Sequence, residues 1–474
     1  GISKDEIINL SFKTDNMMKN IAGILCILLC GLTLHLQANG LSSEKRNRKP
    51  EWVENHPVNP DYYIGIGMAQ KSNENYLQIA KTNALQDLIS EISVQITGSS
   101  SLKQIATNDE MVSEYESNTR LKIQEQLENH ELVDTWEDDE EYWVYYQLSK
   151  SKYQMAKQEK ITRAKNKSLQ HYNDARQAEK TLNIGNAVRF YLEAFRAVYD
   201  YLNEDLTVLL EDGKKDLPNE IYSSYFKLLN NIELKASPNE LNVTILKPVS
   251  NEIEVSAIYK GKGNIANLPL KAAFEKGDGN ITKSAITGDN GKARFDINQV
   301  TSKTSDQSIL FTFDLPSYFE DENNEMVKAL FYKENSIAST RILLNVEGLT
   351  AKLNAEETLF GNSSDERPIE NEIKRFLTSN YFSMTEDNPD VIIELSIDTK
   401  EGDYKPQFKL FSTITSVDIS FINAENDEVI LTEGFTNLRS TSTQSFEDAA
   451  DKAARMVVQK LKSNVTPKLK KYNF

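Results

Sequence analysis

The stretch "DYYIGIGMAQKS", residues 61–72, carries residue types and a spacing that could begin a phosphate-binding site. A short strand pattern ends at Gly65 and Gly67, and a helical pattern follows, as at the start of a dinucleotide-binding unit. The third glycine of that motif would fall where the chain has Gln70. The acidic residue expected at the end of a second strand would be Asp87, but it lies inside the helical pattern. The phosphate-binding motif is therefore incomplete.

The glycine pair has a second, structural explanation. Residues alternate between the two faces of a strand, so Gly65 and Gly67 lie on the same face. Two residues without side chains leave a smooth patch, against which the following helix can pack closely through Ala80 and Ala84. We therefore expect these glycines to pack a helix rather than to bind a nucleotide.

Other residues that could do chemistry are few. The histidines are His35, His56, His130 and His171, and no H-E-x-x-H, G-x-S-x-G or P-loop motif is present. The densest carboxylate cluster, "WEDDEEYW" at 136–143, could serve acid–base chemistry. That pattern is more typical of a solvated hairpin tip, and it lacks the glycine of a calcium-binding loop. We expect no enzyme activity, catalytic residue, metal site or cofactor.

Aromatic residues are the remaining candidates, because they are frequent in and beside the strands predicted for the first folded segment. Aromatic-rich strands mostly supply core residues and cross-strand pairs. An exposed subset could instead bind a partner protein or a glycan. The residues singled out for that role are Tyr62, Tyr63, Trp143 and Tyr145.

Length and charge limit the classes of protein and partner. The 474 residues are enough for about three or four domains. The formal net charge of −17, from 54 basic and 71 acidic side chains, repels phosphate backbones. Nucleic acid is therefore not an expected partner.

The N-terminal segment has the pattern of a secretory signal. A basic Lys19 precedes an apolar run over residues 21–34, and Ala38 fits the small-residue cleavage pattern. The run is shorter than the ~20 residues of a membrane span. Residues 1–16 precede the start-like Met17-Met18 and resemble either sequence before the true start or the remnant of an upstream leader. We expect export.

Both cysteines lie inside the apolar run. Cleavage at Ala38 would leave a mature chain without cysteine, which excludes disulfides, thiol catalysis and cysteine-bound metal. The alternative is a lipoprotein in which Cys26 or Cys30 is acylated as the new N-terminus. Leu25 and Leu29 stand where such signals prefer a small residue. Both alternatives stay open.

The periodicity of hydrophobic residues predicts a multidomain α+β chain. In the first domain, Ile92, Val94 and Ile96 alternate as in a strand, and a hairpin follows around the acidic turn Glu137–Glu141. The last helix has an apolar stripe at Ala449, Ala450, Ala453, Met456, Val457 and Leu461. The expected segments are a signal segment with upstream leader at 1–40, a small α+β domain at 41–150, a helical region with a tetratricopeptide-like (TPR-like) hairpin at 151–237, an Ig-like β-sandwich at 238–345 and a second α+β domain at 346–474.

The first domain resembles the LPP20 lipoprotein family of Gram-negative bacteria. The matching pieces, in order, are "PEWV" at 50–53, "YYIGIGMA" at 62–69, "QIAKTNALQDLISEISVQITGSSSL" at 78–102 and "YWVYYQLSK" at 142–150. Two other resemblances concern later segments. The piece "AITGDNGKARFDI" at 285–297 resembles bacterial Ig-like domains, and the segment from "DVIIELSID" to the last helix is similar to curli-secretion and TolB N-terminal-like domains.

The family resemblance implies a scaffold or assembly role in the envelope, in the periplasm or at the outer membrane, and no known catalytic residues to carry over. The expected function is a non-enzymatic scaffold that binds other envelope proteins or cell-wall material. The alternatives are a surface adhesin or glycan-binding module and a hydrolase with an unrecognised site.

Overall fold

A computed structural model of the chain describes residues 48–93, 105, 109–125, 127–249, 252–304, 306–363, 366–472 and 474. The signal segment predicted at 1–40, with Cys26 and Cys30, lies outside these residues. Helices and strands both occur throughout, which confirms the predicted multidomain α+β class. The chain divides into two compact units, the first formed by Gly1–Ile96 with Arg120–Gln154 and the second by Thr97–Thr119 with Met155–Phe474. The boundaries predicted from the sequence for the five segments stay predictions.

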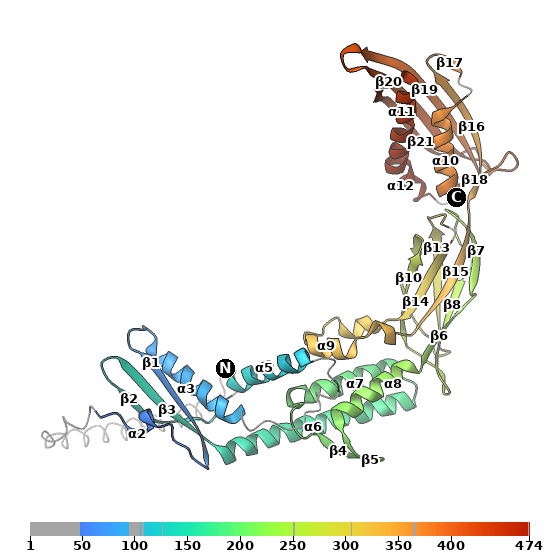
Figure 1. The fold of residues 1–474 in the computed structure, drawn as a ribbon. Coiled ribbons are helices and arrows are strands. Elements are labelled where there is room, and N and C mark those ends of the chain that lie inside the picture. Colours follow the sequence, from blue (N-terminus) through green and yellow to red (C-terminus); the bar gives the residue numbers. More distant parts are fainter. Residues whose placement is uncertain are drawn as a thin grey trace, which may run out of the picture. The chain divides into compact units, whose positions relative to one another are not determined.

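The first unit contains a three-stranded antiparallel sheet in the order β1-β3-β2, with a long helix packed on one face (Figure 1). The hairpin of β2 and β3 lies where the sequence predicts it, around the acidic turn. Helix α3 packs mainly on β1 and less on β3. The elements are α2 (Glu51–Glu54), β1 (Tyr62–Gln70), α3 (Tyr76–Ser93), β2 (Glu131–Glu137) and β3 (Glu141–Ser149).

One strand expected in this unit begins as helix. Helix α3 continues through Ile92 to Ser93, so the strand predicted from Ile92 onward is wrong at its start. Ile92 is buried against Tyr63 and Leu148, as part of the core under the helix. Val94 and Ile96 lie outside the described residues.

The second unit begins with helices whose facing residues are small and tightly packed. Ala175 on α6 and Ala187, Tyr191 and Ala194 on α7 are fully buried. Asp216 caps α8, where Pro218 stands in the first turn. The elements are α5 (Asp109–Glu125, which extends into the first unit), α6 (Lys150–Lys180), α7 (Ile184–Val198), β4 (Thr207–Leu210), β5 (Gly213–Asp216) and α8 (Leu217–Asn230).

Two sheets follow and pack face to face as a β-sandwich. Their orders are β12-β10-β14-β15-β7 and β11-β13-β8-β6. Phe295 and Phe311, one from each sheet, have ring centroids 5.0 Å apart in the shared core. The strands are β6 (Ile232–Ser237), β7 (Glu240–Thr244), β8 (Glu252–Tyr259), β9 (Gly263–Asn264), β10 (Pro269–Lys276), β11 (Gly279–Ile281), β12 (Ser284–Ile286), β13 (Lys292–Val300), β14 (Gln307–Phe313) and β15 (Ser339–Glu347), and the helix α9 (Glu325–Phe331) interrupts the strands before β15.

A buried carboxylate joins the helices to the sandwich. Glu179 on α6 accepts hydrogen bonds from the hydroxyl groups of Tyr191 on α7, at 3.2 Å, and Tyr259 on β8, at 2.8 Å. It also pairs with Arg176 at 2.9 Å and with Lys262 at 3.3 Å. Because a buried charge is costly unless several partners satisfy it, this cluster orients the two parts of the unit toward each other.

The C-terminal domain is a sheet in the order β17-β16-β19-β20-β21, with β18 beside β16. Helix α11 packs on β20 and β21 and against α10. Its predicted stripe is buried except for Met456, which is exposed. The elements are β16 (Leu349–Leu359), β17 (Asn362–Ser363), α10 (Pro368–Asn380), β18 (Phe382–Met384), β19 (Val391–Lys405), β20 (Leu410–Asn423), β21 (Val429–Ser442), α11 (Phe446–Lys460) and α12 (Thr466–Leu469).

Candidate functional site

The two glycines of β1 form the contact with α3. A Cβ atom on Gly65 would lie 2.1 Å from the carbonyl oxygen of Ala84, and one on Gly67 would lie 2.1 Å from that of Ala80. No side chain fits in such a space. The prediction that this pair packs the helix is confirmed, and the backbone that a phosphate would need is covered by α3.

The strand register divides the sheet into a helix-covered face and an opposite face. Gly67 pairs with Val144, on the covered face. Met68 pairs with Trp143, and Trp143 pairs with Trp136, so these three side chains share the opposite face.

This opposite face is rich in aromatic residues, and we call it the aromatic face. Its strand residues are half-buried. The short helix α2 places Trp52 against this face, and the ring centroid of Trp52 is 5.6 Å from that of Tyr145. All three tryptophans of the chain lie here. The aromatic face consists of Trp52, Ile66, Met68, Trp136, Trp143 and Tyr145.

Polar contacts hold the aromatic side chains in place. The indole of Trp52 donates to Asp134 at 3.0 Å, and the indole of Trp143 donates to Glu141 at 3.0 Å. Lys49 pairs with Glu141 at 3.2 Å and lies 5.2 Å from the ring centroid of Trp136. The hydrogen bonds from Trp143 and Lys49 lower the pKa of Glu141, so this carboxylate is ionised at neutral pH.

One polar atom of the aromatic face has no partner. The indole nitrogen of Trp136 is buried and makes no hydrogen bond to any residue that the structure describes. Buried donors are nearly always satisfied in proteins, and a donor without an acceptor costs about 1–3 kcal/mol.

The four aromatic candidates from the sequence divide between the two faces. Trp143 and Tyr145 lie on the aromatic face, and Tyr62 alternates onto the same side of β1. Tyr63 is only 1% exposed, on the helix side, where its ring meets Tyr153, so it does not belong to the surface.

The two outer strands of the sheet differ at their free edges. On β1, the backbone N–H groups of Ile64 and Ile66 donate to Glu91, at 2.5 Å, and to Asp87, at 2.9 Å. Asn83 donates to the carbonyl of Met68 at 2.9 Å. The three side chains come from successive turns of α3, and they occupy the hydrogen-bonding groups that another strand would need.

The edge of β2 has no such cover among the described residues. No side chain from another element bonds to its backbone within those ranges, although Asp134 accepts from the next residue in the strand, Thr135. Leu132 and Val133 are 54% and 44% exposed, and the strand is exposed along nearly its whole length. An exposed strand edge beside apolar side chains is a site at which an extended segment of a partner can pair.

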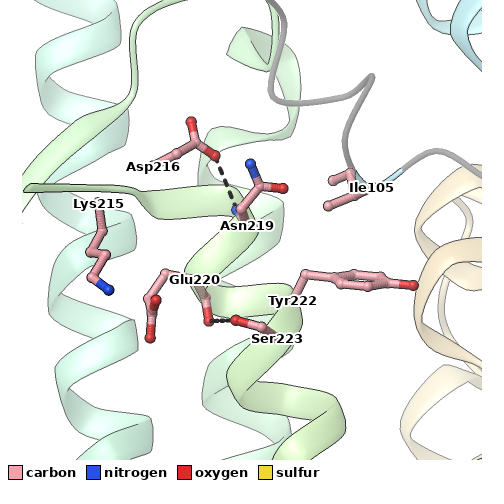
Figure 2. A pocket seen from close by; sticks show the side chains of 7 residues that line it. All are labelled: Ile105, Lys215, Asp216, Asn219, Glu220, Tyr222 and Ser223. Carbon is pink, nitrogen blue, oxygen red and sulfur yellow. Dashed lines mark hydrogen bonds between the residues drawn. The ribbon is translucent and has the colours of Figure 1, made fainter.

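A pocket of about 410 Å³ lies in the second unit, beside the first turn of α8 (Figure 2). Its charged groups already have protein partners: Asp216 accepts from the backbone of Asn219 at 3.1 Å, and Glu220 accepts from Tyr172 at 3.1 Å. Nothing in this lining selects a ligand. The lining residues are Ile105, Lys215, Asp216, Asn219, Glu220, Tyr222 and Ser223.

No described helix is both long enough and apolar enough to cross a membrane. No group of three or more histidine, cysteine, aspartate or glutamate side chains in these ranges is arranged to hold a metal ion.

Comparison with solved structures finds matches of low identity, three of which each cover about a quarter of this chain. The hypothetical protein CT253 from Chlamydia trachomatis shares 12% identity over 26% of this chain and 98% of its own, with a TM-score of 0.20. A minor lipoprotein from Acinetobacter baumannii shares 11% identity over 26% of this chain and 91% of its own, with a TM-score of 0.18. A PelC dodecamer from Paraburkholderia phytofirmans shares 15% identity over 26% of this chain and 88% of its own, with a TM-score of 0.18. These TM-scores are too low to establish a common fold.

Comparison with curated proteins finds no match to this chain. A family model does match, and it covers the domain that carries the aromatic face and the open edge of β2. The match agrees with the resemblance expected from the sequence and is consistent with an envelope-associated protein. Residues 50–149 match the model of the family described as LPP20 lipoprotein.

Proposed function

We propose that the protein is a non-enzymatic scaffold of the bacterial envelope, which holds another envelope protein through its first domain. The observation that carries the proposal is the combination of a half-buried aromatic face with one open strand edge in the same small sheet. Tryptophan and tyrosine are the residues that most often dominate protein interfaces. The match of residues 50–149 to a lipoprotein family supports an envelope location.

The arrangement of the aromatics favours a protein partner over a glycan. A glycan-binding module would present a row of exposed rings, whereas the three tryptophans here are half-buried, and the indoles of Trp52 and Trp143 are fixed by hydrogen bonds. The free backbone groups of β2 offer a further means of pairing with a polypeptide. The surface adhesin or glycan-binding module remains the alternative.

The proposed location is the periplasm or the outer membrane. Fractionation of native cells, with the intact mass of the mature protein, separates the two forms that the sequence leaves open. An unmodified N-terminus near Asn39 in the soluble fraction would support a mobile scaffold. An acylated Cys26 or Cys30 in the outer-membrane fraction would support an anchored one.

Site-specific photo-crosslinking in native cells tests the binding surface. A photoreactive residue at Val133, on the open edge, is compared with one at Leu77, which is 53% exposed in the first turn of α3. We expect a discrete crosslinked envelope protein from position 133 and none from 77. Equal crosslinking from both positions would contradict the proposal.

A substitution then connects the aromatic face to the same partner. Trp143→Ala should weaken binding by about tenfold or more if this ring is an interface anchor. Thermal unfolding of the variant shows whether the domain still folds. Retention on purified cell-wall sacculi that depends on Trp143, without any protein crosslink from position 133, would instead support the glycan-binding alternative.

A further inference from the structure

The turn between β19 and β20 lies at one end of the C-terminal sheet (Figure 1). The other end adjoins the sandwich, where Lys247 pairs with Asp390 at 2.7 Å. Strand β16 leads away from that contact for 11 residues, roughly 35 Å, and its pairing with β19 stops at Thr399. Pairing of β19 with β20 continues further, to Lys405 and Leu410. The turn therefore extends beyond β16 at the end of the domain opposite the sandwich.

Aromatic side chains are exposed at this turn. Phe408 is 69% exposed and Tyr404 is 45% exposed. The ring of Tyr404 lies 4.6 Å from that of Phe411, which in turn lies 5.1 Å from Phe446 on α11. The ring of Tyr404 is thus supported by other aromatic rings, and the more exposed Phe408 lies four residues further along the same turn.

Two basic side chains lie within the turn, although the chain as a whole is acidic. Residues 404–411 contain Lys405 and Lys409 and no acidic residue, whereas the whole chain has a net charge of −17. Carboxylates occur nearby, at Glu401 and Asp403 on β19 and at Glu447 and Asp448 on α11, where Asp448 pairs with Lys452 at 2.8 Å. Positive side chains therefore outnumber negative ones within residues 404–411 themselves.

We propose that this turn inserts into the surface of an anionic phospholipid bilayer. Phe408 and Tyr404 would enter the interfacial region, where aromatic rings are favoured, and Lys405 and Lys409 would contact lipid phosphates. The proposal does not depend on the function proposed for the first domain. A lipid surface suits the turn better than a protein does, because a specific protein interface buries about 800 Å² on each partner, more than a narrow turn offers. Two lysines give weak attraction, so the turn orients the domain at a membrane rather than anchoring it alone.

A polarity-sensitive fluorophore next to Phe408 tests the insertion. It is attached at Gln407→Cys in the full chain, in which Cys26 and Cys30 are replaced by serine. The matched control carries the fluorophore at Glu425→Cys, in the exposed turn between β20 and β21. Vesicles contain phosphatidylethanolamine with phosphatidylglycerol, and neutral vesicles contain phosphatidylcholine alone.

We expect vesicles with phosphatidylglycerol to raise and blue-shift the emission at position 407 and to leave position 425 unchanged. Phe408→Ser should abolish the change. Replacing Lys405 and Lys409 by glutamine should weaken vesicle binding about fivefold for each lysine and about thirtyfold for both. The same replacement at Lys276 and Lys283, which are exposed on the sandwich, should have little effect.

Three results would overturn the proposal. The first is no change at position 407 with either kind of vesicle, and the second is an equal change at both labelled positions. The third is an equal response to neutral and anionic vesicles, which would remove the role of the lysines. A response at position 407 to lipid-free envelope proteins, with none to vesicles, would assign the turn to a protein partner and would also reject the membrane.

Discussion

Asp87 of α3 accepts the backbone N–H of Ile66 in β1 at 2.9 Å, so a helix that covers the sheet also closes one of its edges. The same carboxylate oxygen lies 2.9 Å from Nε2 of His56. Gly65 and Gly67, which resemble part of a nucleotide-binding motif, instead let α3 pack close to β1. The carboxylates of α3 can then reach the backbone of β1 and protect its edge.

Replacing Asp87 and Glu91 together by alanine should uncover the edge of β1. Each substitution leaves a backbone N–H without its acceptor, and the free energy of unfolding should fall by about 1–3 kcal/mol for each. The uncovered strand should also promote self-association, which sedimentation velocity measures. Glu74→Ala, an exposed change in the turn before α3, is the control. A variant as monomeric and as stable as that control would contradict the role of the two carboxylates.

Gly67→Ala should destabilise the first domain. The new methyl group would meet the backbone of Ala80 and Ala84, and overpacking of this kind costs about 1–3 kcal/mol, occasionally more. Chemical denaturation followed by tryptophan emission measures the effect, because all three tryptophans lie in this domain. Gly288→Ala, in the sandwich, is the control, since its nearest contact would be an ordinary 3.4 Å. It is followed by circular dichroism, because the sandwich contains no tryptophan. An unchanged midpoint for Gly67→Ala would show that α3 is free to move away.

Glu179→Gln should weaken the contact between the helices and the sandwich, with a definite pH dependence. Burial alone would raise the pKa of Glu179, but the hydroxyl of Tyr259 and the charge of Arg176 lower it below its usual 4.5. Glu179 therefore stabilises the fold above that pH, and the stabilisation is lost as pH falls. We expect the free energy of unfolding to fall by about 1–3 kcal/mol at neutral pH. This difference should become smaller in acid, and circular dichroism during unfolding measures it. A loss that does not change with pH would contradict this account.

Glu357→Ala should show the opposite pH dependence. The buried carboxylate of Glu357, on β16, accepts the backbone N–H groups of Ile369 at 3.2 Å and Glu370 at 2.8 Å, in the first turn of α10. Burial raises its pKa above the usual 4.5 despite these bonds. Its contribution to stability is therefore largest below that pH and decreases as pH rises through the folded pKa.

The cost of Glu357→Ala, about 1–3 kcal/mol at neutral pH, should thus increase toward pH 4. Circular dichroism across this range measures it, with the exposed neighbour Glu356→Ala as the control. If the destabilisation caused by Glu357→Ala instead became smaller in acid, the folded chain would favour the ionised form of Glu357, and the prediction would be wrong.

Regular periodicity made much of the fold predictable. The alternation in 131–149 predicts the hairpin of β2 and β3, and Pro368 marks the start of α10, where the structure has it. The start of the strand predicted at Ile92 is wrong because Ile92 also lies four residues after Leu88, so helix and strand periods coincide there.

The candidate site was only partly predictable. The alternation that places Gly65 against α3 places Tyr63 there too, so the sequence contained the signal that Tyr63 is buried. The position of Trp52 has no such signal, because it depends on α2 folding back over a sheet whose other strands come much later in the chain. The lack of cover on β2 among the described residues likewise depends on how far α3 reaches across the sheet.

The unequal edges of the first sheet also limit the size of any assembly it enters. A sheet with two free edges can add strands at both edges and grow into a fibre. Head-to-tail contacts between subunits also produce fibres when they do not close into a ring. Here one direction of growth is blocked by side chains of the same chain, so a strand that pairs with β2 ends the sheet unless it brings a free edge of its own. Strand pairing through this domain would therefore yield complexes of fixed stoichiometry, in which the partner determines whether the sheet extends further.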